Sequence, residues 1–141
     1  ALDDALPLVA PVVRELHPDP EGWRGVVAPT VRAEAASHIR APSTAAFSVT
    51  LTFHLQRPGA HLGKMGVRPS APAWPGKKPD LDKLVRAVLD ALTGEAWNDD
   101  AQVIEIVARK RYVNPFNPDD RIGLSVQLQE APWRKARRSF K

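Results

Sequence analysis

Four aspartates at two points of the chain are the residues best suited to chemistry. Asp80 and Asp82 stand two positions apart at the start of a segment with helical periodicity. A second acidic pair, Asp99 and Asp100, directly precedes a run with strand-like alternation. Hard divalent cations such as Mg²⁺ bind clustered carboxylate oxygens. Capping or turn formation explains one or two of these residues but not easily four at two boundaries, so the pattern favours a metal site.

A helix that would position the first pair is predicted shortly after Pro79. Its apolar residues recur as one stripe of a 3.6-residue period, namely Leu81, Leu84, Val85, Val88, Leu89 and Leu92. Gly94 stands where a left-handed C-terminal cap is expected. Side chains two positions apart in a regular helix diverge by about 200°. The carboxylates of Asp80 and Asp82 therefore converge only if Asp80 lies in an extended lead-in, which Pro79 favours by restricting Lys78.

Three further segments alternate between apolar and polar residues, as β-strands do. They are residues 47–55, 103–113 and 122–128. The simplest pairing joins the second and third as a hairpin. In the second strand, alternation places Val103, Glu105 and Val107 on one side and Ile104 and Ile106 on the other. These elements predict a small α/β (α+β) domain, with a mixed or antiparallel sheet that carries the helix on one face.

The first 46 residues have weaker patterns. Apolar residues between Leu2 and Leu16 have roughly helical spacing, but Pro7 and Pro11 argue against one continuous helix. Residues 30–39 are predicted as a short helix. The chain does not begin with Met, and two interpretations stay open: a leading segment has been lost, or unobserved loops have been closed up.

Composition narrows the class of protein. A chain of 141 residues with 43% hydrophobic and 26% charged residues forms one globular domain. It has no cysteine, which excludes disulfides and thiolate metal sites. No segment is long enough to span a membrane, and the N-terminus lacks the basic region of a signal peptide. We therefore expect a cytoplasmic protein that does not bind membranes.

Basic residues are unevenly distributed along the chain, whose formal net charge is +4. A loop rich in proline and glycine, residues 57–78, contains no acid, and neither do the last nine residues, which carry five Lys or Arg. Such segments favour a polyanionic partner, although basic loops and tails that merely solubilise the chain are equally compatible with this pattern. Trp74 in the loop offers a flat face for an unpaired base. Asp119 and Asp120 are a rival acidic pair, better explained by turn chemistry.

Three spaced motifs together resemble the RusA family of Holliday-junction resolvases. They are residues 78–94, the run Asn98-Asp99-Asp100-Ala101-Gln102-Val103, and Lys110-Arg111-Tyr112. The resemblance extends over about residues 45 to 128 and is far more specific than an isolated Asp-x-Asp. It implies that Asp80, Asp82 and Asp100 bind a divalent metal, Mg²⁺ or Mn²⁺, with Asp99 as their acidic neighbour. It also implies a catalytic role for a basic residue one helical turn after Asp82, which is Arg86.

The chain departs from the familiar pattern of the family at two positions. Members often have Lys where this chain has Arg86, and Asn where it has Lys83. Arginine keeps the charge and can grip a phosphate with two donors, but it cannot give up a proton. Chains of this family usually open with a short strand and a basic, glycine-containing segment, and neither is evident here.

The resemblance implies a nuclease of DNA recombination and repair. A homodimer would nick four-way DNA junctions symmetrically, since a two-fold junction calls for two equivalent active sites. The nuclease domain would span residues 1–131, followed by a basic tail, residues 132–141. The expected DNA contacts are Lys64, Arg68, Lys77, Lys78, Lys83, Lys110 and Arg111. Two alternatives stay open: a junction-binding protein with lost or weakened catalysis, and a basic interaction protein whose aspartates only cap its elements.

Overall fold

The computed structural model describes residues 7–10, 29, 31–37, 39 and 41–131. The predicted basic tail lies outside these residues. The strands are β1 (Pro7–Ala10), β2 (Ala46–Leu55), β3 (Leu62–Gly63), β4 (Gly66–Val67), β5 (Val103–Tyr112) and β6 (Gly123–Ala131). The helices are α2 (Leu81–Leu92), a short helix through residues 31–37, and the single 3₁₀ turns η2 (Gly59–His61) and η3 (Asp100–Gln102). These elements confirm the predicted α+β class, the helix after Pro79 and all three predicted strands.

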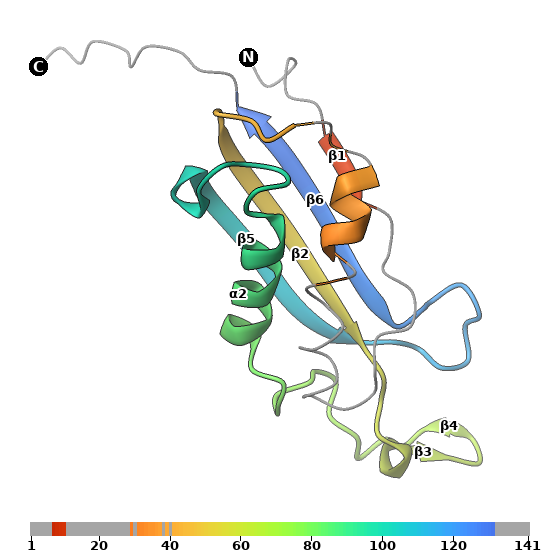
Figure 1. Cartoon of the computed structure of the whole chain (residues 1–141). Coiled ribbons are helices and arrows are strands. Elements are labelled where there is room, and N and C mark those ends of the chain that lie inside the picture. Colours follow the sequence, from red (N-terminus) through yellow and green to blue (C-terminus); the bar gives the residue numbers. More distant parts are fainter. Residues whose placement is uncertain (1–6, 11–28, 30, 38, 40, 132–141) are drawn as a thin grey trace, which may run out of the picture.

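The main sheet has four strands in the order β1-β6-β2-β5 (Figure 1). β2 lies between β5, to which it is parallel, and β6, to which it is antiparallel. Leu51, for example, pairs with Ala108 on one side and Val126 on the other. The mixed sheet was predicted, but the hairpin between β5 and β6 was wrong. β5 and β6 do not pair with each other, because β2 lies between them. The chain that joins β5 to β6 therefore crosses β2.

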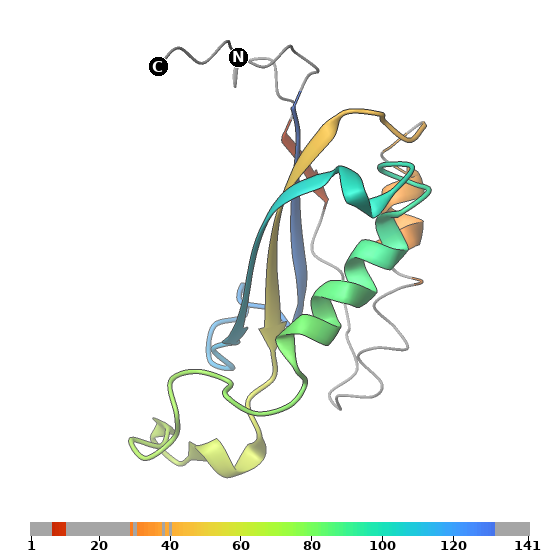
Figure 2. The same cartoon turned by 90° about the vertical axis from the view of Figure 1, so that its left-hand side faces the viewer.

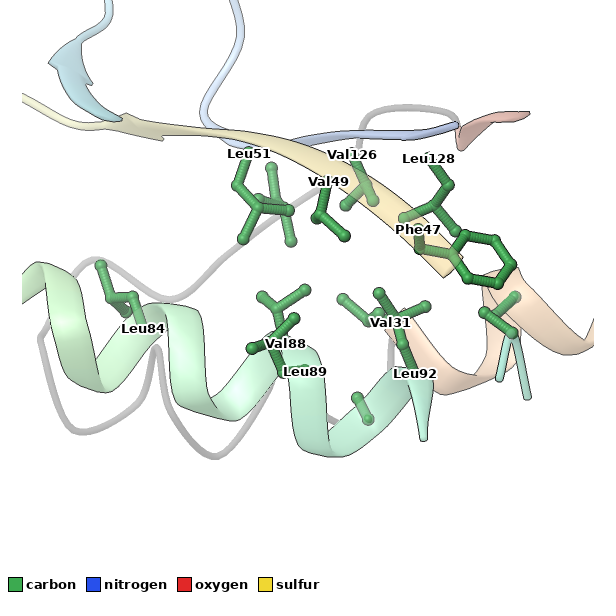
Figure 3. Close-up of a cluster of buried hydrophobic side chains, with 14 of the residues drawn as sticks. Val31, Phe47, Val49, Leu51, Leu84, Val88, Leu89, Leu92, Val126 and Leu128 are labelled. Carbon is green, nitrogen blue, oxygen red and sulfur yellow. The ribbon is translucent and has the colours of Figure 1, made fainter. Parts of the chain in front are cut away.

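α2 and the helix of residues 31–37 lie on one face of this sheet (Figure 2). The apolar stripe of α2 packs against the alternate residues of β2 that point to the same side, with Leu84 and Val88 facing Val49 and Leu51 across the core (Figure 3). All four side chains are fully buried. Since full burial of such a side chain contributes about 1.5–3 kcal/mol, this interface fixes α2 on the sheet.

The turn after α2 is closed by a buried tryptophan. The Trp97 indole donates to the Thr93 hydroxyl at 3.0 Å, and its ring lies 5.2 Å from that of Phe47, centroid to centroid. Gly94 has φ +92, as predicted for a left-handed cap. The chain therefore leaves the helix at a fixed point, and this determines where Asp99 and Asp100 emerge.

A bulge at the start of β5, opposite the first residues of β2, changes the predicted alternation of β5. Phe47 pairs with Val103, but Ser48 pairs with Glu105, so one extra residue of β5 is accommodated there. Val103 consequently packs against the core, whereas the prediction placed it on the side of Glu105. The acidic segment therefore enters the sheet through an irregular strand end.

The N-terminal region contains a strand that the sequence pattern did not indicate. β1 pairs antiparallel with β6, from Pro7 opposite Gln129 to Ala10 opposite Val126. Four residues at a sheet edge, beginning with proline, give almost no periodic signal. The predicted short helix is confirmed at residues 31–37, with Val31 and Ala35 buried. No helix within the described part of the chain is long and apolar enough to cross a membrane.

Candidate functional site

Asp80 is the last residue before α2 and has an extended backbone, with φ −71 and ψ 131. This confirms the predicted extended lead-in. The Asp80 side chain makes no capping hydrogen bond, so N-capping does not explain the residue. Its carboxylate lies 3.6 Å from the Lys83 ammonium, and both side chains are about half exposed, at 44% and 53%. Such a pair contributes little to stability and leaves the carboxylate accessible. Asp82 is exposed in the first turn.

The lead-in is held by a lysine from the sheet. The Lys110 ammonium donates to the backbone oxygens of Lys77 at 2.8 Å and of Pro79 at 2.9 Å. The peptide bond between Lys78 and Pro79 is cis. Lys110 therefore connects β5 to the backbone immediately before Asp80. Lys110 was predicted as a DNA contact, and no local pattern in the sequence indicates that it positions the lead-in.

The second acidic pair divides into two roles. Asp99 caps η3: its Oδ1 accepts a hydrogen bond from the backbone N–H of Ala101 at 2.9 Å. The Gln102 side chain completes a capping box by accepting from the N–H groups of Asn98 and Asp99, each at 3.0 Å. The spacing Asp-x-x-Gln is a known sign of such a box, so this arrangement was open to prediction from the sequence.

Gln102 also fixes the acidic segment against the start of β2. Its amide nitrogen donates to the backbone oxygens of Ser43 and Ala45, each at 2.8 Å. One side chain thus joins the η3 turn to the segment that leads into the central strand. Asp100, which begins η3, is held in place by this support without using its own carboxylate.

The Asp100 carboxylate faces Arg86, and the two form a hydrogen-bonded ion pair. The Arg86 Nε also donates to Asp90 Oδ1 at 3.1 Å, one turn further along α2. The hydrogen bond that Arg86 donates to Asp100, and then the charge of Asp90, raise the pKa of Arg86, although the slight burial of the guanidinium lowers it. Arg86 therefore stays charged and lies between two carboxylates.

The three aspartates predicted as metal ligands do not form one cluster in the described chain. Asp80 and Asp82 lie at the start of α2, whereas the segment between α2 and β5 that includes Asp100 lies toward the other end of this helix (Figure 1). Within the described residues, no three His, Cys, Asp or Glu side chains are arranged to hold a metal ion. The donors available at the start of α2 are two accessible carboxylates. Mg²⁺ is commonly bound by one or two carboxylates together with substrate phosphates, so this pair fits such an ion.

The basic residues predicted to contact DNA have different environments. Lys64, Arg68, Lys77 and Lys78 are exposed on the loop between β2 and α2. Arg111 instead donates to both carboxylate oxygens of Asp120, at 2.8 and 2.5 Å, and to His54 Nδ1 at 2.6 Å. Asp120 also accepts from the N–H of Asn114 at 2.8 Å, which confirms that its acidic pair belongs to a turn. Contact with DNA stays a prediction for all of these residues.

Comparison with known proteins is consistent with the motifs. The family described as Endodeoxyribonuclease RusA matches residues 23–125, which is more than two thirds of the chain. This match includes the lead-in, α2, η3 and β5. No curated protein matches the chain at a significant level. On the family match, the chain belongs to the RusA family of endodeoxyribonucleases, whose members resolve Holliday junctions.

Proposed function

We propose that this chain is a Mg²⁺-dependent endodeoxyribonuclease that resolves four-way DNA junctions by paired, symmetric nicks. The observation that carries this proposal is the pair of accessible carboxylates at the start of α2, in a chain that belongs to the RusA family. Asp80 is positioned by Lys110 and not used for capping, which leaves its oxygens available for a ligand. Mn²⁺ would serve in place of Mg²⁺, since both take carboxylate oxygens.

Different residues would bind the ion, stabilise the charge on the phosphate and contact the DNA. Asp80 and Asp82 would hold the ion, which supplies a Lewis acid for the phosphodiester oxygens. Arg86, one turn after Asp82, would stabilise the charge that develops on the phosphate. Since an arginine does not release its proton at neutral pH, its contribution is electrostatic and it is not a general acid. Lys64, Arg68, Lys77 and Lys78 would contact the DNA backbone.

Asp100 has a conditional role in this proposal. It is paired with Arg86, and Asp100 is 40% exposed and Arg86 53% exposed. Pairs this accessible exchange partners at little cost. A phosphate that binds Arg86 would release the Asp100 carboxylate. For this carboxylate to serve as the third ligand, the η3 segment would also have to move toward the start of α2. Asp99 would remain a cap and support its neighbour, as its hydrogen bonds to Ala101 and Gln102 indicate.

A junction-binding protein with weakened catalysis is the second candidate. The specific observation in its favour is that Arg86 pairs with both Asp90 and Asp100. If this pairing persists on DNA, Asp100 cannot bind metal and Arg86 cannot reach the phosphate. Binding would then continue without cleavage, and the cleavage assay below separates the two candidates.

We propose that the active form is a homodimer paired along β5. This strand is an edge of the sheet and exposes three aliphatic residues, Ile104, Ile106 and Val107, at 68, 43 and 42%. Exposed edge strands pair readily with another strand. An antiparallel register centred on Val107 places Glu105 of each copy opposite Arg109 of the other. This register is self-complementary in charge and satisfies the two-fold symmetry of a junction.

A nicking assay on a synthetic four-way junction tests the proposed reaction. The wild-type protein should nick the junction with Mg²⁺ and not with EDTA. Asp80→Asn or Asp82→Asn should reduce nicking by about 100-fold or more, the usual scale for loss of one catalytic electrostatic interaction. Junction binding should stay equal or become slightly tighter, because the substitution removes negative charge that faces a polyanion.

Asp119→Asn is the matched control for this assay, because it removes an exposed carboxylate from a turn far along the chain. It should leave both nicking and binding unchanged. Parallel loss of binding and cutting in Asp80→Asn would count against a ligand role for that residue. Wild-type protein that binds the junction but does not nick it would select the second candidate.

A further inference from the structure

The β3–β4 hairpin presents a fully exposed methionine at its tip. Gly63 pairs with Gly66, so Lys64 and Met65 form a two-residue turn. Met65 is 101% exposed, the most exposed of the large hydrophobic side chains in the described chain. The hairpin projects beyond the end of β2 and lies at the end of the molecule where α2 begins (Figures 1 and 2). Isolated exposed apolar residues are common, so exposure alone does not show that Met65 binds a partner. The residues around Met65 have to be considered as well.

The hairpin is braced from its base to its turn. The Arg68 N–H donates to the His61 backbone oxygen at 2.8 Å, and the Arg68 Nε donates to the Leu62 oxygen at 3.1 Å. At the turn, Gly66 has φ +114 and lies against the Phe116 ring, which is 3.7 Å from the position that a Cβ would occupy. A rigid two-residue turn therefore holds Met65 outward.

The base of the hairpin is also fixed to the sheet. The Arg57 guanidinium lies 4.5 Å from the centre of the Tyr112 ring at the end of β5, and the His61 ring meets the same tyrosine edge to face at 5.5 Å. Arg57 also donates to the Pro72 backbone oxygen at 2.8 Å. These contacts connect the hairpin to the strand whose Lys110 holds the lead-in of Asp80. The base of the hairpin and the lead-in of Asp80 are thus both held by side chains of β5.

The charge around Met65 points to nucleic acid as its partner. Residues 56–79 contain no Asp or Glu, and Lys64 and Arg68 are exposed beside the tip. An apolar side chain with cations on both sides is suited to DNA, because the apolar group can contact an unstacked base while the cations contact the neighbouring phosphates. Proteins that distort DNA insert such apolar wedges, methionine among them, between base steps. Attachment to a membrane would require a larger apolar face than Met65 and the partly exposed Val67 provide.

We propose that Met65 inserts between bases at the branch point of a four-way junction and holds them unstacked. When the junction is open, each base pair at the branch point stacks on one side only, so separating it costs less there than within an arm. The hairpin would then place the branch point relative to Asp80 and Asp82 and so select where the strand is cut. This inference rests on the proposed function, because it requires the junction to be the substrate.

Fluorescence of 2-aminopurine at the branch point tests the proposal, since this base brightens when it unstacks. Wild-type protein should raise the signal of a junction labelled at the branch point but not of one labelled within an arm. Met65→Ala should abolish most of this rise and weaken the preference for junction over duplex by roughly 10-fold, the scale of burying such a side chain. Met65→Leu should retain the rise because it keeps the apolar volume.

The outcomes separate this inference from the function on which it rests. An unchanged signal and an unchanged junction preference in Met65→Ala, with the wild type still nicking junctions, would overturn the wedge alone. A wild-type protein that neither prefers nor nicks junctions would overturn the proposed function as well. If Met65→Ala leaves DNA binding intact but weakens binding to vesicles with anionic lipids, the tip would be assigned to a membrane surface and the wedge rejected.

Discussion

At the scale of single residues, His54 shows how hydrogen bonds determine a protonation state. The Arg111 guanidinium can only donate, so His54 Nδ1 must accept the hydrogen bond between them. The neutral ring then carries its proton on Nε2 and donates it to the Ser125 hydroxyl at 2.7 Å. Partial burial, and secondly the charge of Arg111, lower the pKa of His54, although Asp120 opposes this shift. Protonation of His54 would place a hydrogen on Nδ1 against the guanidinium.

Stability should therefore fall as the pH drops below about 6.5, the usual pKa of histidine. In this range the unfolded chain binds the proton of His54 more readily than the folded chain, so acidification favours unfolding. Urea unfolding at pH 8, 6.5 and 5.5 measures the effect, and His54→Gln should remove its own part of the slope. An unchanged slope in His54→Gln would show that the arrangement with Arg111 and Ser125 does not hold in solution.

Asp120 should make the stability of the fold depend on pH in a second, more acidic range. The hydrogen bond from Arg111 lowers the pKa of Asp120 from 3.8 to about 2. A depressed carboxyl pKa stabilises the fold above pH 4, and this contribution is lost as the pH falls toward 2. Asp120→Asn should cost about 1–3 kcal/mol at neutral pH, since it leaves the Arg111 guanidinium without its charged partner.

Prediction from the sequence succeeded at this scale where the cause was local. Pro79 restricts its neighbour, and Asp80 indeed has an extended backbone. The role of Asp99 could be predicted, because the capping box is a local sequence pattern. The role of Asp100 could not, because its pairing with Arg86 joins residues 14 positions apart. No periodicity or spacing rule predicts which of several exposed carboxylates an exposed arginine side chain contacts.

At the scale of elements, the same division between local and distant causes explains the fold prediction. α2 and the strands from 46 to 55, 103 to 112 and 123 to 131 carry strong apolar periods and were predicted. The partners of these strands were not, because β5 and β6 are neighbours in sequence but each pairs with β2. The bulge opposite Phe47 and the short β1 also depend on contacts between distant residues.

Lys110 provides a prediction for the element that carries Asp80. Lys110→Met should leave the backbone oxygens of Lys77 and Pro79 without their donor and loosen the lead-in. We expect a loss of about 1–3 kcal/mol in unfolding free energy. We also expect weaker Mn²⁺ binding by titration calorimetry, under conditions in which the variant is fully folded.

Arg121→Met is the control for this experiment, because Arg121 is an exposed residue of the loop before β6. It should change neither stability nor Mn²⁺ affinity. If Lys110→Met lost stability but bound Mn²⁺ as tightly as the wild type, Lys110 would support the fold without positioning the candidate ligands.

At the scale of the whole molecule, the proposed dimer depends on the open edge of β5. Val107 would lie opposite its own copy at the centre of the two-fold register. Val107→Lys should therefore bring two like charges together and weaken dimerisation by roughly 10-fold or more, measured by sedimentation. Gln127→Lys, an exposed position on β6, should have no such effect.

A charge exchange tests the register itself. Glu105→Arg or Arg109→Glu alone should weaken the dimer, and the two together should restore it, because each pair again has opposite charges. A wild-type protein that stays monomeric at the concentrations at which it nicks junctions would contradict the dimer. Equal weakening by the single and double variants would contradict this register.

The location of a divalent ion in crystals soaked with Mn²⁺ tests the central claim most directly. We predict anomalous density between the carboxylates of Asp80 and Asp82, and no such density in crystals of Asp80→Asn. Density at Asp119 and Asp120 instead, or none under conditions in which the protein nicks junctions, would contradict the assignment of the start of α2 as the metal site.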